Sequence, residues 1–198
     1  MRRARQFSRL VSAIVLATAM SAGPVLAGPA ATIAPAVHID NFGQINARYY
    51  RGGQPEGRDY TDLAALGVKT IVNLTSDDAQ AEEPALARQN GLRYFQIPMT
   101  TRQAPTAAQL AEFMAIVDDP ANQPVYVHCV GGRHRTGVMT AVYRMTDDGW
   151  TSDQAFAEMK KYQFGMDFLH PEFKKFVYEF RPAAQPTTPA VLATQVIN

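Results

Sequence analysis

The chain has 198 residues, of which 46% are hydrophobic and 19% are charged, with 13 glycines and 13 prolines. These values exclude a collagen-like or largely disordered chain and fit one domain with a hydrophobic core. The formal net charge is +1, and the single cysteine, Cys129, excludes an internal disulfide framework and any metal site built from several cysteines.

The first 27 residues have the order of a secretory signal peptide. Four arginines precede residue 10, an apolar stretch runs from 10 to 20, and Val25-Leu26-Ala27 supplies small residues where a signal peptidase cuts. We predict cleavage after Ala27 and a periplasmic or secreted protein. The apolar stretch is too short to remain as a stable membrane anchor, although an uncleaved anchor helix is the alternative.

Removal of residues 1–27 changes the charge of the chain. The segment holds four arginines and no acidic residue, so the mature chain carries 15 basic and 18 acidic residues. A net charge of about −3 makes the chain a poor candidate for non-specific nucleic-acid binding, and it has no polybasic stretch for a membrane surface. We therefore expect no nucleic-acid partner, and an anionic substrate has to be held by a local site.

Residues 37–181 are predicted to fold, between an Ala- and Pro-rich linker at 28–36 and a disordered tail at 182–198. Apolar and β-branched runs predict strands at 49–51, 68–74, 92–97 and 125–127. Helical spacing, capping residues and glycine stops predict helices at 59–66, 82–90, 106–117, 138–149, 151–161 and 171–180. Asp59 is expected to cap the first helix, and capping boxes are expected at Thr106 with Gln109 and at Thr151 with Gln154.

The alternation of strands and helices predicts an α/β domain, with a central, mostly parallel sheet flanked by helices on both faces. Ligands of such sheets bind beyond the carboxyl ends of the strands. The strand at 125–127 runs directly into His128 and Cys129. These two residues are therefore expected at the ligand-binding edge of the sheet.

Residues 128–137 contain the groups that are needed to bind and attack a phosphate. The segment lies between a predicted strand and a predicted helix, so backbone N–H groups and the helix N-terminus can surround one anion. Gly131 and Gly132 allow the backbone to approach that anion closely. Arg135 can hold two phosphate oxygens at once, which a lysine cannot do.

Cys129 is the expected nucleophile of this segment. A helix N-terminus and neighbouring cations favour the ionised thiolate over the thiol. Thr136 can donate its hydroxyl to the sulfur as the sulfur leaves, and His128 is expected to hold the loop through hydrogen bonds rather than to act as a base. The predicted substrate-binding loop also contains Val130, Gly131, Gly132, Arg133 and His134.

The cysteine, the arginine six positions later and the threonine after it resemble the signature loop of cysteine-dependent tyrosine and dual-specificity phosphatases. The chain is most similar to the atypical dual-specificity group, which includes inositol-pyrophosphate phosphatases and secreted bacterial relatives. The likeness covers most of the folded segment, through Asn41-Phe42, Tyr50-Arg51, the strand to Leu74, Ile97-Pro98 and the stretch from Ala121 to Gly137.

The resemblance implies a dual-specificity phosphatase-like fold and a phosphorylated protein or a small phosphorylated metabolite as the partner. It also implies a nucleophilic Cys129, a phosphate-binding Arg135, and loop amides from Val130 to Arg135 around the phosphate. No metal and no cofactor are implied. This agrees with the four histidines, whose spacing does not suit a zinc site: His38, His128, His134 and His170.

The chain departs from this family at the general acid. Most members carry an aspartate on a mobile loop before the cysteine, whereas no Asp or Glu occurs here from Leu92 to Ala111. Loss of such an acid costs about 10²–10⁴ in rate, and it matters least for acidic leaving groups. The gap therefore favours aryl phosphates or phosphoanhydrides over phosphoserine. Asp77, Asp78 and Asp167 are candidate replacements, and each is also explained as a solvated loop residue or a helix cap.

Two other functions fit the same residues. Without its acid, the loop can hold phosphorylated partners without hydrolysing them, as a binding module. A reactive cysteine also fits sulfur transfer or arsenate reduction, although sulfur transfer usually uses a shorter loop. Arsenate reduction usually needs further thiols, and this chain has only Cys129.

Overall fold

The computed structural model describes residues 36–76 and 78–182 of the chain. The predicted signal peptide at 1–27 lies outside these residues, as do the linker up to residue 35 and the tail from residue 183. Those three segments therefore remain predictions. Within the described residues, no helix is both long enough and apolar enough to cross a membrane.

Five strands of the described chain form one sheet, in the order β1-β2-β5-β3-β4. They are β1 (Gly43–Asn46), β2 (Tyr49–Gly52), β3 (Thr70–Asn73), β4 (Arg93–Gln96) and β5 (Val125–His128). β1 pairs with β2 in antiparallel orientation, and all other neighbours are parallel. The predicted mostly parallel sheet is therefore confirmed, and β5 lies at its centre.

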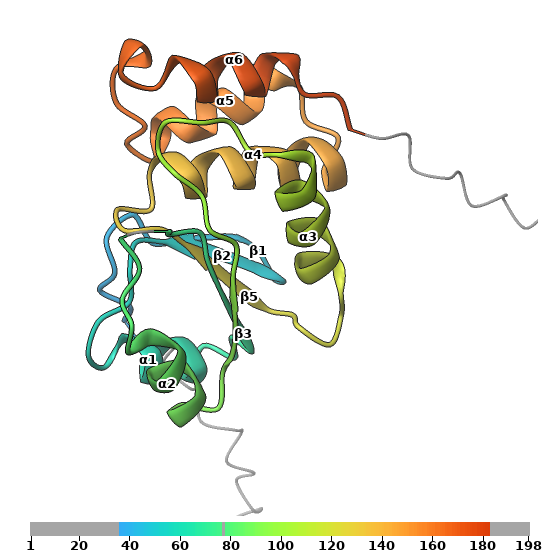
Figure 1. Cartoon of the computed structure of the whole chain (residues 1–198). Helices are drawn as coiled ribbons and strands as arrows, with labels where there is room; N and C mark the ends of the chain where they lie inside the picture. Colours follow the sequence, from blue (N-terminus) through green and yellow to red (C-terminus); the bar gives the residue numbers. More distant parts are fainter. Residues whose placement is uncertain (1–35, 77, 183–198) are drawn as a thin grey trace, which may run out of the picture. The chain divides into compact units, whose positions relative to one another are not determined.

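Helices cover both faces of this sheet (Figure 1). One face carries α1 (Asp59–Ala65) and α2 (Glu83–Gln89), whose buried side chains share a cluster with Ile71 of β3 and Tyr126 of β5. Further along the chain lie α3 (Ala107–Asp118), α4 (His134–Asp147), α5 (Ser152–Lys161), the short 3-10 helix η1 (Asp167–Leu169) and α6 (Pro171–Glu179). The helices α3 to α6 cover the other face, so the predicted two-sided α/β architecture is confirmed.

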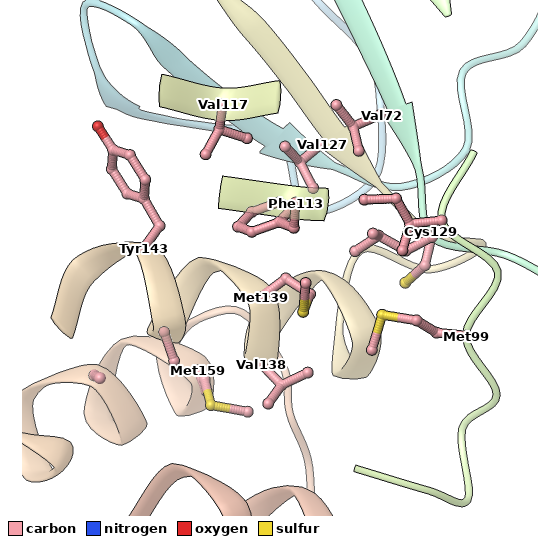
Figure 2. Close-up of a cluster of buried hydrophobic side chains, with 14 of the residues drawn as sticks. Val72, Met99, Phe113, Val117, Val127, Cys129, Val138, Met139, Tyr143 and Met159 are labelled. Carbon is pink, nitrogen blue, oxygen red and sulfur yellow. The ribbon is translucent and has the colours of Figure 1, made fainter. Parts of the chain in front are cut away.

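The side chains of β5 explain why both faces need cover. Val125 and Val127 pack into the cluster below α3 and α4, whereas Tyr126 points to the opposite face. Successive strand residues point to opposite faces, so a strand with only apolar and aromatic residues has to be buried on both sides. Figure 2 shows Val127 and Val72 packed with Phe113 and Met139.

Local signals located most helix ends, with two errors. The helix predicted at 138–149 is α4, which begins at His134; the prediction missed its first turn because residues 134–137 are polar or glycine and carry no apolar periodicity. Both predicted capping boxes form, at Thr106 with Gln109 and at Thr151 with Gln154. The predicted cap of α1 was wrong: Arg58 is the N-cap, and it makes no side-chain capping bond. Asp59 is the first helical residue, and its carboxylate instead accepts a hydrogen bond from the backbone N–H of Glu56 at 2.8 Å.

The sequence did not predict β1. Gly43–Asn46 contains one apolar residue, Ile45, and no alternating pattern. This strand lies at the edge of the sheet and is held by its antiparallel pairing with β2. Its pairing depends on a neighbour in space rather than on its own residues.

Candidate active site

The predicted phosphate-binding loop lies at the carboxyl end of the central strand. Cys129 directly follows β5, and His134 begins α4. The loop of residues 129–133 therefore joins a buried strand to the N-terminus of a helix of 14 residues. This is the edge of the sheet at which α/β domains bind ligands, as the alternation of elements predicted.

Three carbonyl groups of this loop are turned away from its centre. The Val130 carbonyl accepts from the backbone N–H of Gln54 at 3.0 Å, and the Gly131 carbonyl accepts from the Asn41 side chain at 2.8 Å. The Gly132 carbonyl accepts from the Arg51 guanidinium at 2.5 Å.

A peptide unit carries its N–H opposite its carbonyl. Outward carbonyls at 130, 131 and 132 therefore direct the N–H groups of residues 131–133 towards the inside of the loop. No described residue accepts a hydrogen bond from those three N–H groups. The loop thus has the form of an anion-binding concavity, with the N-terminus of α4 beside it.

Gly132 cannot be replaced without a change in this loop. Its φ is +63°, in the left-handed region that favours glycine. A Cβ at this position would lie 2.4 Å from the carbonyl carbon of Gly52, a backbone atom that cannot rotate away. The absence of a side chain at Gly132 therefore lets the loop contact the backbone of β2.

Most of the predicted site residues line one pocket of about 390 Å³. Its lining includes the predicted Cys129, Val130, Gly131, Arg133, His134 and Arg135, together with Asp78 and Thr101. Cys129 and Arg135 are each 3% exposed. The sulfur is thus shielded by the core beside Met99 (Figure 2), yet it opens onto the same pocket as the arginine.

An acidic residue from another loop forms an ion pair with Arg135. The carboxylate of Asp78 accepts hydrogen bonds from both terminal nitrogens of Arg135, at 2.8 and 2.6 Å. These bonds hold the pKa of Asp78 below its usual value. Burial opposes the charge of Arg135, but the contacts with Asp78 and the nearby Cys129 outweigh it and raise the pKa of Arg135.

Of the three candidate acids, Asp78 is the one that the described structure brings to the pocket. Asp78 is at the same time an exposed loop residue, as predicted, since its side chain is 40% exposed and its carboxylate also accepts from the backbone N–H of Ser76 at 3.2 Å. Asp167 binds Lys160 at 2.8 Å and Lys174 at 2.7 Å, away from the pocket lining. Asp77 lies outside the described residues.

His128 is fully buried behind the loop and lies beside an acidic residue that the sequence did not predict at the site. Its Nε2 lies 2.8 Å from a carboxylate oxygen of Glu83, the first residue of α2. Glu83 is also fully buried and accepts hydrogen bonds from Asn73 at 2.6 Å and from Tyr94 at 3.4 Å. The sequence could have suggested Glu83 as a neighbour of the site, because it lies in the first turn of a helix that follows a buried strand.

Thr136 and His134 hold different positions around the loop. Thr136 is fully buried, and no described residue is a hydrogen-bond partner of its hydroxyl. His134 lines the pocket, with its Nε2 at 3.0 Å from the Phe164 carbonyl and its ring 3.7 Å from that of His170. Burial and the neighbouring His170 lower the pKa of His134. His170 in turn contacts the Thr101 carbonyl at 3.1 Å, which ties the 3-10 segment to the pocket rim.

The surroundings of the pocket differ in charge on its two sides. A cavity of about 490 Å³ adjoins it at Val130 and Asp78, and its lining contains Asp40, Glu56 and Asp59. On the other side, a cavity of about 480 Å³ is lined by residues 100–103, which include Arg102, and by the paired Arg135 and Asp78. In the described residues, no group of three or more His, Cys, Asp or Glu side chains is placed to hold a metal ion.

Comparisons with known proteins agree with this site. Residues 38–176 match the family model described as a DSP-PTPase phosphatase fused to NAD⁺ kinase. The chain is 31% identical over 163 residues to the dual specificity protein phosphatase TpbA of Pseudomonas aeruginosa, covering 79% of this chain and 73% of TpbA. It is 27% identical over 130 residues to the inositol diphosphatase SIW14 of Saccharomyces cerevisiae, covering 63% of this chain and 46% of SIW14.

Solved structures of the same proteins share the fold. The crystal structure of P. aeruginosa TpbA matches with a TM-score of 0.62 at 26% identity, over 72% of this chain and 86% of that chain. The catalytic core of Siw14 from S. cerevisiae matches with a TM-score of 0.64 at 24% identity, over the same shares of the two chains. The chain therefore belongs to the DSP-type phosphatases, the atypical dual-specificity group of cysteine-dependent phosphatases.

Proposed function

We propose that the chain hydrolyses phosphate monoesters of the phosphotyrosine type through a phosphocysteine intermediate formed on Cys129. The observation that carries this proposal is the shared pocket: Cys129 and Arg135 open onto one concavity whose backbone N–H groups have no other described acceptor. Such a site can hold three phosphate oxygens while the sulfur faces the phosphorus atom.

The reaction has two steps. The Cys129 thiolate attacks the phosphorus, the S–P bond forms, and the bond from phosphorus to the tyrosine oxygen breaks as that oxygen takes a proton. Water then attacks the same phosphorus, the S–P bond breaks, and the sulfur leaves as a thiolate while inorganic phosphate is released. Arg135 and the N–H groups of the loop bind the charge that develops on the phosphoryl oxygens in both steps.

Thr136 and His128 act on the sulfur and the loop. The buried Thr136 hydroxyl has no described partner, so it is available to donate to the sulfur as the S–P bond breaks. His128 lies 2.8 Å from Glu83, and its ring nitrogens make no hydrogen bond to the loop among the described residues. Its complete burial and its absence from the pocket lining support a structural role at the start of the loop rather than that of a base. Arg133 and His134 line the mouth of the pocket, where the parts of a substrate beyond the phosphate lie.

Asp78 is the proposed general acid. In the free site its carboxylate is ionised, because Arg135 holds its pKa below the usual value. A phosphate that takes over the guanidinium removes this stabilisation and adds a negative charge beside the carboxyl group. Both changes raise the pKa of a carboxyl group. The protonated Asp78 can then donate to the leaving oxygen and later accept the proton of the attacking water.

The charges around the pocket favour phosphotyrosine in a protein over an inositol pyrophosphate. Asp40, Glu56 and Asp59 line the adjoining cavity, and they would repel a ligand that carries many phosphates. A TpbA variant with serine in place of cysteine has been solved in complex with phosphotyrosine, at a TM-score of 0.60 and 26% identity to this chain. The name of SIW14 makes phosphoanhydrides the second candidate class.

A comparison of rates tests the proposal. A phosphotyrosine peptide, a phosphoserine peptide and an inositol pyrophosphate are offered to the purified protein, and we expect the phosphotyrosine peptide to be hydrolysed fastest. C129S is expected to abolish turnover, and R135K to lose about 10²–10³ in kcat/KM because an ammonium cannot bind two oxygens in one plane. R144K, a change remote from the pocket, is the matched control.

Each contrary result has a clear meaning. Full activity of C129S would exclude the phosphocysteine intermediate. Micromolar binding of phosphopeptides with no turnover of any of the three substrates would make the protein a binding module. Preference for the inositol pyrophosphate would assign the phosphoanhydride class.

We also propose that the chain is exported to the periplasm or secreted after cleavage behind Ala27. The arginines and the apolar stretch of the first 20 residues support this proposal. Expression of the full chain in a bacterial host, followed by mass spectrometry of the protein recovered from the periplasm, is expected to give an N-terminus at Gly28. Recovery of an intact N-terminus from the membrane fraction would indicate an uncleaved anchor.

A further inference from the structure

A second arginine lies under the phosphate-binding loop. Arg51, in β2, is fully buried. One of its terminal nitrogens donates to the Gly132 carbonyl, and its guanidinium carbon lies 4.0 Å from the centre of the Tyr162 ring. Its Nε and its other terminal nitrogen have no hydrogen-bond partner among the described residues.

No carboxylate of the described chain forms an ion pair with Arg51. Glu158 acts on it electrostatically, but Glu158 is already bound to Arg144 at 2.8 Å. Burial lowers the pKa of Arg51, yet a guanidinium keeps its proton at any ordinary pH. The protein thus holds a buried positive charge without the acid that normally accompanies one, which is costly for the fold.

An anion bound in the loop would supply the negative charge that Arg51 lacks. Arg51 holds Gly132, whose neighbours supply the inward N–H groups, and it interacts electrostatically with Cys129. A charge inside protein is screened far less than one at the surface. A buried cation at this place therefore attracts an anion in the loop even in concentrated salt.

We propose that Arg51 is a positioning residue that sets the affinity of the loop for a tetrahedral oxyanion, by holding the Gly132 carbonyl outward and by supplying a fixed positive charge beneath the bound phosphate. The proposal assigns this role to the charge as well as to the hydrogen bond. It concerns the same pocket as the proposed function, but its test needs phosphate binding only.

Cys129 gives a direct readout because it is the only cysteine of the chain. Alkylation by iodoacetamide is followed by mass spectrometry at increasing concentrations of inorganic phosphate, and the half-protecting concentration is recorded for each variant. R51K keeps the positive charge, whereas R51Q keeps a donor for the Gly132 carbonyl but loses the charge. We expect the half-protecting phosphate concentration of R51K to lie within about threefold of the wild-type value, and that of R51Q to be at least about tenfold higher.

The dependence on salt separates this role from that of a surface cation. The increase in the half-protecting phosphate concentration of R51Q is expected to be the same at about 50 and 500 mM NaCl. The charge that R51Q removes is buried, so salt screens it little. R93Q is the matched control: Arg93 also donates to a backbone carbonyl, that of Ala121 at 3.2 Å, but it lies outside the pocket lining. It is expected to leave the half-protecting concentration unchanged.

Equal protection of R51Q and the wild type, with circular dichroism spectra that agree, would overturn the proposal, as would equal defects of R51Q and R51K. If R51Q does not fold, the pH dependence of R51K decides. A buried ammonium, unlike a guanidinium, can lose its proton as the pH rises. The ratio of half-protecting concentrations between R51K and the wild type is expected to rise at least about threefold from pH 7 to pH 9, and a constant ratio would refute a role for the charge.

The outcome is separable from that of the proposed function. A protein in which phosphate protects Cys129 through Arg51, but which hydrolyses no phosphate ester, would overturn the enzymatic proposal and leave this inference standing. If the wild type hydrolyses phosphotyrosine while R51Q binds phosphate as tightly as the wild type does, the proposed function stands and the inference about Arg51 is overturned.

Discussion

The carboxylate of Asp78 and the guanidinium of Arg135 form two hydrogen bonds, at 2.8 and 2.6 Å, across 57 positions of the sequence. This is the two-pronged geometry with which an arginine binds a phosphate. In the free protein, the loop after β3 therefore occupies the group that is expected to bind the substrate. A phosphorylated ligand has to displace Asp78 before it can bind Arg135.

Exchange of Asp78 for asparagine separates two effects. D78N removes the negative charge that competes for Arg135, so we expect inorganic phosphate to inhibit the variant at a several-fold lower concentration. D78N also removes the proposed proton donor. We therefore expect kcat for a phosphoserine peptide to fall by about 10²–10³ and that for nitrophenyl phosphate by less than about tenfold, because its leaving group needs no proton. Steady-state rates and phosphate inhibition constants measure both effects.

Asp167 provides the control for this experiment. Its carboxylate is also paired with cations, here Lys160 and Lys174, but it lies at the start of η1 and does not line the pocket. D167N is expected to leave both constants at the wild-type values. A uniform loss of rate in D78N, independent of the leaving group, would assign Asp78 a role in loop placement rather than in proton transfer.

The close contact between β2 and the loop depends on Gly132. In G132A the new methyl group would meet the backbone of Gly52 at 2.4 Å, and the backbone would keep a φ that alanine disfavours. We expect a loss of about 2 kcal/mol or more in the free energy of unfolding. Chemical denaturation measures it. In G131A the methyl group would meet only the Arg133 side chain at 3.5 Å, so little change in stability is expected. Equal stability of the two variants would contradict this reading of the contact.

The ends of α3 and α4 bring two carboxyl groups together, those of Asp118 and Asp147. Burial and the neighbouring Asp118 raise the pKa of Asp147 to about 6, and burial also raises the pKa of Asp118. The folded value of Asp147 lies above its ordinary value of 3.8. The contribution of protonated Asp147 to the free energy of unfolding is therefore fully present below about pH 4, and it is lost as the pH rises through about 6.

D147N should relieve the repulsion above that pH. The amide cannot ionise, so we expect Tm to exceed that of the wild type by about 1–3 °C at pH 8, with a gain that disappears at pH 4. Thermal unfolding followed by circular dichroism measures both values. D148N is the control, since Asp148 binds Arg144 at 2.7 Å and its removal gives no gain at pH 8. A gain in Tm of D147N that is the same at both pH values would rule out repulsion between the two carboxylates as its cause.

The parts of the site that the sequence predicts are those made within a short stretch of chain. The strand, the glycines and the helix around Cys129 and Arg135 lie within 23 residues, from Val125 to Asp147, and residues 128–137 suffice to indicate a phosphate-binding loop. The capping boxes at Thr106 and Thr151 were predictable for the same reason, because a box is closed by hydrogen bonds between residues three positions apart. Local hydrogen bonds and hydrophobic periodicity thus determine the elements and the nucleophilic loop.

The electrostatics of the site are decided by contacts between distant segments. Arg51 reaches the loop across 81 positions, Asp78 reaches Arg135 across 57, and Glu83 of α2 lies 2.8 Å from His128 at the end of β5. A charged residue in a strand or loop carries no local mark of its partner, because the partner is set by the order of the strands. The sequence alone therefore predicts which residues attack and bind the phosphate, whereas the strand order β2-β5-β3 decides which buried charges surround the loop.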